Sequence, residues 1–280
     1  ERALAIFEAA LGPDHQNVAI GLGNLASSYR ELGRPGEAVP LQERALAIFE
    51  AALGPDHQNV AIGLGNLASS YRELGRDDEA VQLGVRALTI TEAALGRDHP
   101  HVATLLGNLA LSFSALGYHD EAVQLGVQAV AIAEAALGPD HPNVASFLGG
   151  LAASSRGLGH PGEAASLEER ALTITEAALG PDHPDVAIRL ANLAESFRVL
   201  GRSGEAVSLQ KRALAITNAA FGPNHPNVKV LREHLDVIRE HTKQSCEQVP
   251  ARFSGRDRNA PCPCGSGRKV KRCHGVHPAS

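Results

Sequence analysis

The chain repeats itself every 42 residues, and this period restricts the fold more than any other feature of the sequence. Residues 1–34 are identical to residues 43–76, and the same register continues without an insertion or deletion to Lys211. Self-similarity at this length is typical of solenoids, in which each repeat adds one thin layer to a stack. Aromatic residues make up only 4% of the chain and Trp is absent, which also favours thin layers over one large core.

Each repeat contains two apolar patterns with the period of an α-helix. In the first repeat, one pattern lies within residues 18–32 and is followed by Gly33, a residue suited to ending a helix. The second lies within residues 37–53 and is followed by Gly54 and Pro55, which stop it. The two apolar stripes are Leu22, Leu25, Ala26 and Tyr29, and then Ala38, Leu41, Ala45, Ile48 and Ala52. We therefore predict an all-α protein built from helix pairs.

The residues of this pattern resemble the tetratricopeptide repeat (TPR). The motif on which this resemblance rests is Leu22-x-Asn24-Leu25-Ala26-x-x-Tyr29-x-x-x-Gly33-Arg34-x-x-Glu37-Ala38. The 42-residue period resembles the long form found in kinesin light chains and many bacterial proteins. The resemblance implies antiparallel helix pairs stacked into a right-handed superhelical solenoid, with a concave groove lined by the first helix of each pair.

The register predicts the organisation of the whole chain. Residues 1–241 form the array, which comprises a partial pair at 1–11, five full pairs within 16–221 and a capping helix at 226–241. A linker at 242–257 leads to a small tail module at 258–275. The first helices are predicted at 16–32, 58–74, 100–116, 142–158 and 184–200.

Two sets of polar side chains recur on the face of the first helices opposite the apolar stripe, the face that would line the groove. An Asn amide both donates and accepts hydrogen bonds, which suits a peptide backbone, and Arg suits carboxylates. Together they predict a peptide ligand, with acidic side chains. The alternative is that Asn bonds the neighbouring repeat and Arg is merely solvated. The sets are Asn24, Asn66, Asn108 and Asn192, and Arg30, Arg72, Arg156 and Arg198.

One His recurs in every repeat, immediately before a first helix. Stacked helices lie about 8–10 Å apart, whereas a zinc–nitrogen bond measures about 2 Å, so neighbouring repeats cannot share an ion through these residues alone. We predict a structural role at the helix start instead. The residues are His15, His57, His99, His141, His183 and His225.

The fourth repeat departs from the others in its first helix. Gly150 replaces the Asn, and Ser155 replaces the aromatic residue found elsewhere as Tyr29 or its equivalents. Interior Gly and the loss of a packed ring both weaken a helix. We expect residues 143–158 to be the least stable part of the array.

Three thiols and an imidazole lie within 13 residues of the tail, as Cys262, Cys264, Cys273 and His274. This set meets the needs of a closed, tetrahedral, structural zinc site. A disulfide or free thiols are the alternative, and Cys246 is expected to be a free thiol. The segment is similar to the SEC-C motif that ends the bacterial preprotein translocase motor, and the similarity implies one zinc ion held by these four residues.

The uneven charge leaves more than one function open. Residues 243–280 carry eight Lys and Arg against two Asp and Glu, although the chain as a whole carries −5. A scaffold that binds peptides in its groove and docks a second partner through the zinc module is the preferred interpretation. A nucleic-acid- or ribosome-associated factor, using the basic tail, is the alternative, and the sensor region of a larger signalling ATPase is a third.

No phosphate-binding loop or catalytic set is present, so no enzymatic activity is predicted within these residues. No apolar run reaches the roughly 20 residues that span a bilayer, and thiols that serve as metal ligands favour the reducing cytoplasm. The chain begins within a predicted helix and contains no Met, so we expect its true start to lie upstream.

Overall fold

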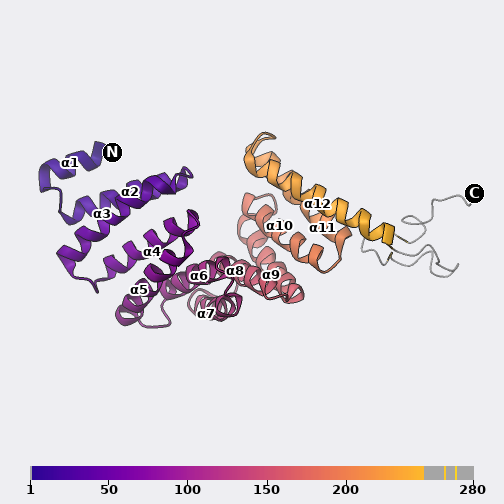
Figure 1. Ribbon diagram of the computed structural model, residues 1–280, viewed down its shortest axis with the longest axis horizontal. Coiled ribbons are helices and arrows are strands. Elements are labelled where there is room, and N and C mark those ends of the chain that lie inside the picture. Colours follow the sequence, from indigo (N-terminus) through magenta and orange to yellow (C-terminus); the bar gives the residue numbers. More distant parts are fainter. Residues whose placement is uncertain (1, 249–261, 263–268, 270–280) are drawn as a thin grey trace, which may run out of the picture. The chain divides into compact units, whose positions relative to one another are not determined.

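The computed structural model describes residues 2–248 together with Cys262 and Lys269 (Figure 1). All regular structure within residues 2–248 is α-helical, as predicted. The helices are α1 (Arg2–Leu11), α2 (Gln16–Glu31), α3 (Pro35–Leu53), α4 (Gln58–Glu73), α5 (Asp77–Leu95), α6 (Pro100–Ala115), α7 (His119–Leu137), α8 (Pro142–Gly157), α9 (Pro161–Leu179), α10 (Pro184–Val199), α11 (Ser203–Phe221) and α12 (Pro226–Gln248).

These helices form two compact units. Unit 1 is Glu1–Pro139 and contains α1–α7, and unit 2 is Asp140–Ser280 and contains α8–α12. Within each unit every helix packs against the next one along the chain, and neighbouring first helices also touch, α4 with α6 and α8 with α10. The units are therefore stacks of helix pairs, the arrangement expected of a solenoid.

The helix starts confirm the structural role predicted for the repeated His. At each of these positions the imidazole Nδ1 accepts a hydrogen bond from the backbone N–H two residues further on, over 3.1–3.2 Å. This bond satisfies one of the N–H groups that the first turn leaves free. At the other end of α2, Gly33 has φ +70°, a left-handed conformation that closes the helix.

Ala, Leu and Val fill the core between the layers. In the first repeat Leu22 and Ala26 are fully buried, and so are Val18 and Ala19, which the apolar stripe did not include. Ala38, Ala45 and Ile48 of α3 are buried as predicted, whereas Ala52 is exposed. Ala at close contacts lets helices approach, so thin layers leave few voids.

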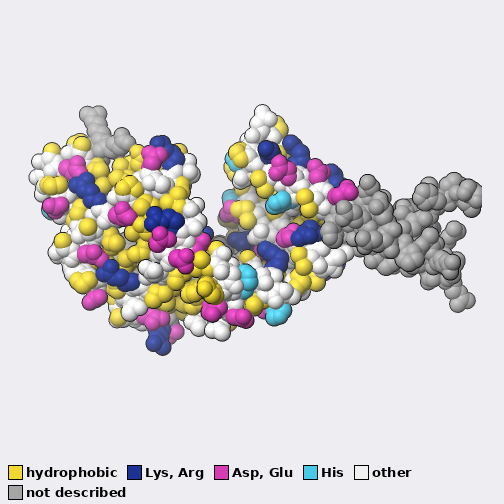
Figure 2. Space-filling view, viewed as in Figure 1, with side chains coloured by type: hydrophobic (Ala, Val, Ile, Leu, Met, Phe, Trp, Pro, Cys, Tyr) yellow, Lys and Arg dark blue, Asp and Glu magenta, His cyan; other side chains and the backbone are white. Residues whose placement is uncertain are grey.

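Arg side chains connect consecutive second helices in both units. Arg44 of α3 pairs with Glu8 of α1 at 2.7 Å, and Arg86 of α5 pairs with Glu50 of α3 at 2.6 Å. Arg212 of α11 repeats the contact in unit 2. Each of these Arg residues also donates to a carbonyl oxygen of the loop preceding a first helix. In each unit, basic and acidic side chains lie beside one another on the surface that Figure 2 shows.

The last helix, α12, is longer than the sequence indicated. It continues to Gln248, seven residues beyond 241, so part of the expected linker is helical. Val228, Leu235 and Ile238 are buried against unit 2, whereas Lys229 and its charged neighbours are exposed, as expected of a helix that ends a stack.

Candidate functional site

The first helices carry the predicted polar residues on an accessible face. Asn24 and Asn66 are exposed, and Asn108 and Asn192 are half-buried. In the described part of the chain, the side chains of Asn24, Asn66 and Asn108 make no hydrogen bond to a side chain of a neighbouring repeat. The amides are therefore available to a ligand, which is the premise of the predicted role.

In unit 1, Asn24 and Asn66 line a hollow of about 250 Å³ between α2, α3 and α4. Ile20 and Ile62 form part of its wall, and they remain 51% and 45% exposed. Gln42 of α3 closes the floor; it is only 4% exposed, and its Oε1 has no hydrogen-bond partner. No charged residue lines this hollow.

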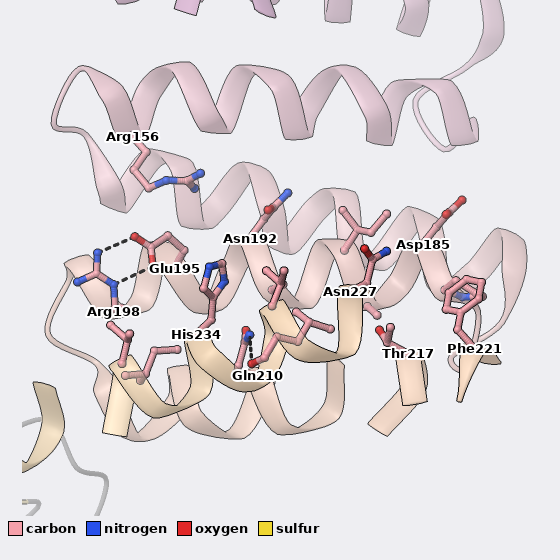
Figure 3. A pocket seen from close by; sticks show the side chains of 18 residues that line it. Arg156, Asp185, Asn192, Glu195, Arg198, Gln210, Thr217, Phe221, Asn227 and His234 are labelled. Carbon is pink, nitrogen blue, oxygen red and sulfur yellow. Dashed lines mark hydrogen bonds and ion pairs between the residues drawn. The ribbon is translucent and has the colours of Figure 1, made fainter. Parts of the chain in front are cut away.

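Unit 2 has a larger groove, of about 800 Å³, at the same position in the repeat register (Figure 3). Asn192, Ile188 and Gln210 correspond to Asn24, Ile20 and Gln42, four repeats further along the chain. Here Gln210 donates from Nε2 to the carbonyl oxygen of Leu231 at 3.0 Å. Unlike the hollow in unit 1, this groove has charged walls.

Charged side chains gather at one end of the unit 2 groove. Arg156 of α8, Glu195 and Arg198 of α10 and His234 of α12 extend into this end in Figure 3, while Phe221 lies at the other. Arg198 binds Glu195 through two hydrogen bonds of 2.6 and 2.7 Å, and they hold the pKa of the Glu195 carboxyl below its ordinary value. Glu195 is therefore ionised and already paired.

The four predicted Arg residues occupy different environments. Arg30 pairs with Glu73 of the next first helix, and Arg198 pairs with Glu195. Arg156 donates from Nη1 to the Ser196 hydroxyl at 3.1 Å. Arg72 is half-buried, and its Nε–H donates no hydrogen bond.

The sequence explains why Arg30 is paired with the next repeat whereas Arg72 and Arg156 are not. Arg30 pairs with Glu73, which lies in the next repeat, one position beyond the residue that corresponds to Arg30. For Arg72 and Arg156, the same position of the next repeat holds Ala115 and Val199, which carry no charge. Of the four, Arg156 and Arg72 have no ion pair to a carboxylate within 4.0 Å among the described residues.

Sequence reasoning missed one ionisable residue of this region, Glu168 of α9. Its side chain is fully buried, and burial raises the pKa of its carboxyl to about 7, against the opposing effects of Arg189, Arg156 and the Asn192 amide. The signal in the sequence was the residue type, because Glu168 is the one acidic residue at a repeat position that otherwise holds Gln42, Gly84, Gly126 and Gln210.

The zinc ligands predicted in the tail lie almost entirely outside the described residues. Cys264, Cys273 and His274 are not described, and Cys262 is buried, with 5% of its surface exposed. Between residues 2 and 248, no group of three or more His, Cys, Asp or Glu side chains is arranged to hold a metal ion. No helix in the described part of the chain is long and apolar enough to cross a membrane.

Comparison with known families gives two matches. Residues 1–51, 19–93, 59–135, 101–177 and 169–219 match the tetratricopeptide repeat family, and residues 258–275 match the SEC-C motif. A comparison with curated protein sequences gave no match.

Solved structures with similar folds include those of two proteins. A kinesin light chain of Podosopora anserina with nearly identical TPR-like repeats, in a form that carries one substitution, is 29% identical, covers 74% of this chain and 97% of its own, and has a TM-score of 0.62. The same protein without that substitution gives a TM-score of 0.61 at 29% identity, covering 74% of this chain and 98% of its own. BtubC (BKLC) from P. vanneervenii is 23% identical, covers 80% of this chain and 89% of its own, and has a TM-score of 0.64, which shows the shared fold.

Proposed function

Because the chain belongs to the tetratricopeptide repeat family, whose repeats are typical of protein–protein interaction scaffolds, we propose that it binds peptide segments of other proteins along the faces of its first helices. The observation that carries this proposal is the recurrence of the same groove in both units, with an Asn amide and an exposed Ile at corresponding positions. The repeat family is typically non-catalytic, and we assign no reaction to the chain.

In unit 1, the ligand is held through its backbone. Asn24 and Asn66 offer both donors and acceptors, and the free Oε1 of Gln42 adds an acceptor at the floor of the hollow. Satisfying a buried, unpaired acceptor is favourable by roughly 1–3 kcal/mol. The exposed Ile20 and Ile62 favour an apolar side chain beside the backbone.

In unit 2, the ligand is held through an acidic side chain. Arg156 presents a guanidinium without a bound carboxylate, and a charge-assisted hydrogen bond to a ligand carboxylate is stronger than one between neutral groups. The groove follows α10 from Asp185 to Arg198, about 20 Å at the helical rise. This length accommodates an extended segment of roughly six residues.

The tail forms a second docking site in this proposal. Three thiols and one imidazole suit a closed tetrahedral zinc site, in which Cys262, Cys264, Cys273 and His274 would hold the ion, and the match to the SEC-C motif supports this assignment. When bound, zinc supplies the free energy that a module too short for a core needs to fold. The basic residues around it favour an acidic protein surface as the partner.

Peptide binding tests the proposal directly. In a peptide array probed with the whole chain, Asn24→Ala combined with Asn66→Ala should weaken the signal of apolar peptides, and Arg156→Ala that of acidic peptides, by about tenfold each. Asn218→Ala and Arg97→Ala are matched controls, because both side chains are exposed outside the grooves.

Binding that survives all three groove substitutions, or that falls equally with the controls, would refute peptide recognition by these faces. In a pull-down with the whole chain, loss of the bound partners after nuclease treatment would favour the nucleic-acid alternative instead.

A further inference from the structure

A carboxyl group lies buried beneath the charged end of the unit 2 groove. Glu168 of α9 has no exposed surface, and it faces Arg156 from α8 and Arg189 from α10. Arg156 and Asn192 line the groove, so two of the three side chains that favour the ionised form of Glu168 are also side chains that a ligand would contact.

This arrangement is particular to the fourth repeat. The corresponding residues in the other second helices are Gln or Gly, and Arg189 stands where the other first helices have Gly21, Gly63, Leu105, Phe147 and Leu231. A Cβ on Gly149 would collide with the Arg189 guanidinium and would lie 3.7 Å from Glu168 Oε1. The Gly therefore provides the space in which Arg189 approaches the buried carboxyl.

The buried carboxyl is poorly satisfied. Neither oxygen of Glu168 has a hydrogen-bond partner of normal geometry, and the Nε of Arg189 lacks one as well. The Asn192 amide lies close enough to favour the ionised form, yet burial outweighs it and the two Arg residues, so the pKa of Glu168 rises to about 7. The charge of this group consequently changes near neutral pH.

We propose that Glu168 competes with an acidic ligand for the positive charge of Arg156, so that protonation of this buried carboxyl strengthens the binding of a ligand carboxylate in the unit 2 groove. The inference rests on the proposed peptide-binding function. With Glu168 ionised, its negative charge offsets Arg156 and repels the ligand. With Glu168 neutral, the positive charge of Arg156 is no longer offset and attracts the ligand carboxylate. By linkage, a bound carboxylate also favours the protonated form of Glu168.

Other ionisable groups face the same end of the groove. Glu195 is paired with Arg198 and stays ionised, and Asp185 lies at the opposite end. His234 of α12 is a further titratable side chain at this end of the groove, and it faces Glu195. A pH dependence alone therefore does not identify Glu168, and variants of the two residues must be compared.

The experiment uses the whole chain and two fluorescein-labelled hexapeptides that differ only in carrying three Glu or three Gln residues. For the unmodified chain, the Kd of the Glu peptide should fall roughly tenfold between pH 8.5 and pH 6.0, which is the effect of a one-unit displacement of the Glu168 pKa by bound ligand. The Gln peptide should bind equally at both pH values.

Glu168→Gln should bind the Glu peptide tightly at both pH values, because it lacks the competing charge. This variant is suited to the fold, since Gln42 and Gln210 occupy the same register position. His234→Gln should keep the tenfold dependence.

The outcomes separate the two proposals. The role of Glu168 is refuted if the Kd of the Glu peptide does not change with pH. It is also refuted if the pH dependence remains in Glu168→Gln and disappears in His234→Gln. In both cases the proposed peptide binding stands. Failure of both peptides to bind at any pH overturns the peptide-binding function of the groove together with this inference.

Discussion

Replacing Glu168 by Gln should stabilise the protein, and increasingly so as the pH rises. Burial raises the pKa of this carboxyl from 4.5 to about 7 in the folded protein. The folded state therefore holds a proton that the unfolded chain loses above about pH 4.5. Stability from this group is fully present below the unfolded pKa and is lost as the pH rises through the folded pKa.

The magnitude follows from the size of the shift. Each unit of pKa corresponds to about 1.4 kcal/mol, so a shift of about 2.5 units costs the ionised form about 3 kcal/mol, and about 2.5 kcal/mol of this falls between pH 5 and pH 8. The Gln variant has no charge to desolvate, and its amide can meet Asn192. Its free energy of unfolding should therefore exceed that of the unmodified chain by about 2 kcal/mol more at pH 8 than at pH 5.

Urea unfolding followed by circular dichroism at pH 5, 6, 7 and 8 measures this difference. A stack of repeats can unfold in stages, so the urea curve can contain two transitions. The transition that involves Glu168 is then the one that differs between the variants at each pH. Glu169→Gln is the matched control, since it removes the same charge from the adjacent, exposed position and should give no pH-dependent gap. A gap between Glu168→Gln and the unmodified chain that stays constant with pH, or that closes at pH 8, would refute the reasoning.

Four further outcomes are expected. His99→Ala should destabilise the chain by about 1 kcal/mol in urea, and His99→Asn should restore most of it, because Asn also caps a helix. Ser155→Ala should leave the free energy of unfolding unchanged or raise it, since the buried Ser155 hydroxyl has no hydrogen-bond partner. Ser154→Ala should lower it by about 1 kcal/mol, because the Ser154 hydroxyl donates to a carbonyl oxygen. If both substitutions lowered the free energy of unfolding equally, this reasoning would be contradicted. Amide hydrogen exchange should be faster in α8 than in α6, because α8 contains interior Gly residues and lacks the aromatic ring. Equal exchange rates in the two helices would contradict this expectation. Elemental analysis should give about one zinc per chain and none after Cys273→Ser, and any other stoichiometry would refute the tail assignment.

The local sequence determined most of the fold. Helix positions followed from the spacing of Leu22 and Ala26 and from Gly33, because a 3.6-residue period and a left-handed Gly act within a few residues of the chain. The caps followed in the same way, since each repeated His bonds the backbone only two residues away. The accessible face of Asn24 was equally predictable, because one helix fixes which side chains share its surface.

Contacts between helices were decided only by the tertiary structure. Arg72 and Arg156 both lack a Glu at the corresponding position of the next repeat, yet Arg156 donates to Ser196 whereas the Nε of Arg72 has no hydrogen-bond partner. The hollow of about 250 Å³ is lined by side chains of three helices and the groove of about 800 Å³ by side chains of four, so no single repeat specifies either volume.

Glu168 shows the physical reason most clearly. Its departure from Gln or Gly is visible in the sequence, but its pKa depends on how completely α8 and α10 exclude water and on where Arg189 and Arg156 come to lie. Desolvation and charge–charge energies depend on distances through space. Periodicity along the chain therefore determined the helices of this protein, and the packing of those helices decided the chemistry of its grooves.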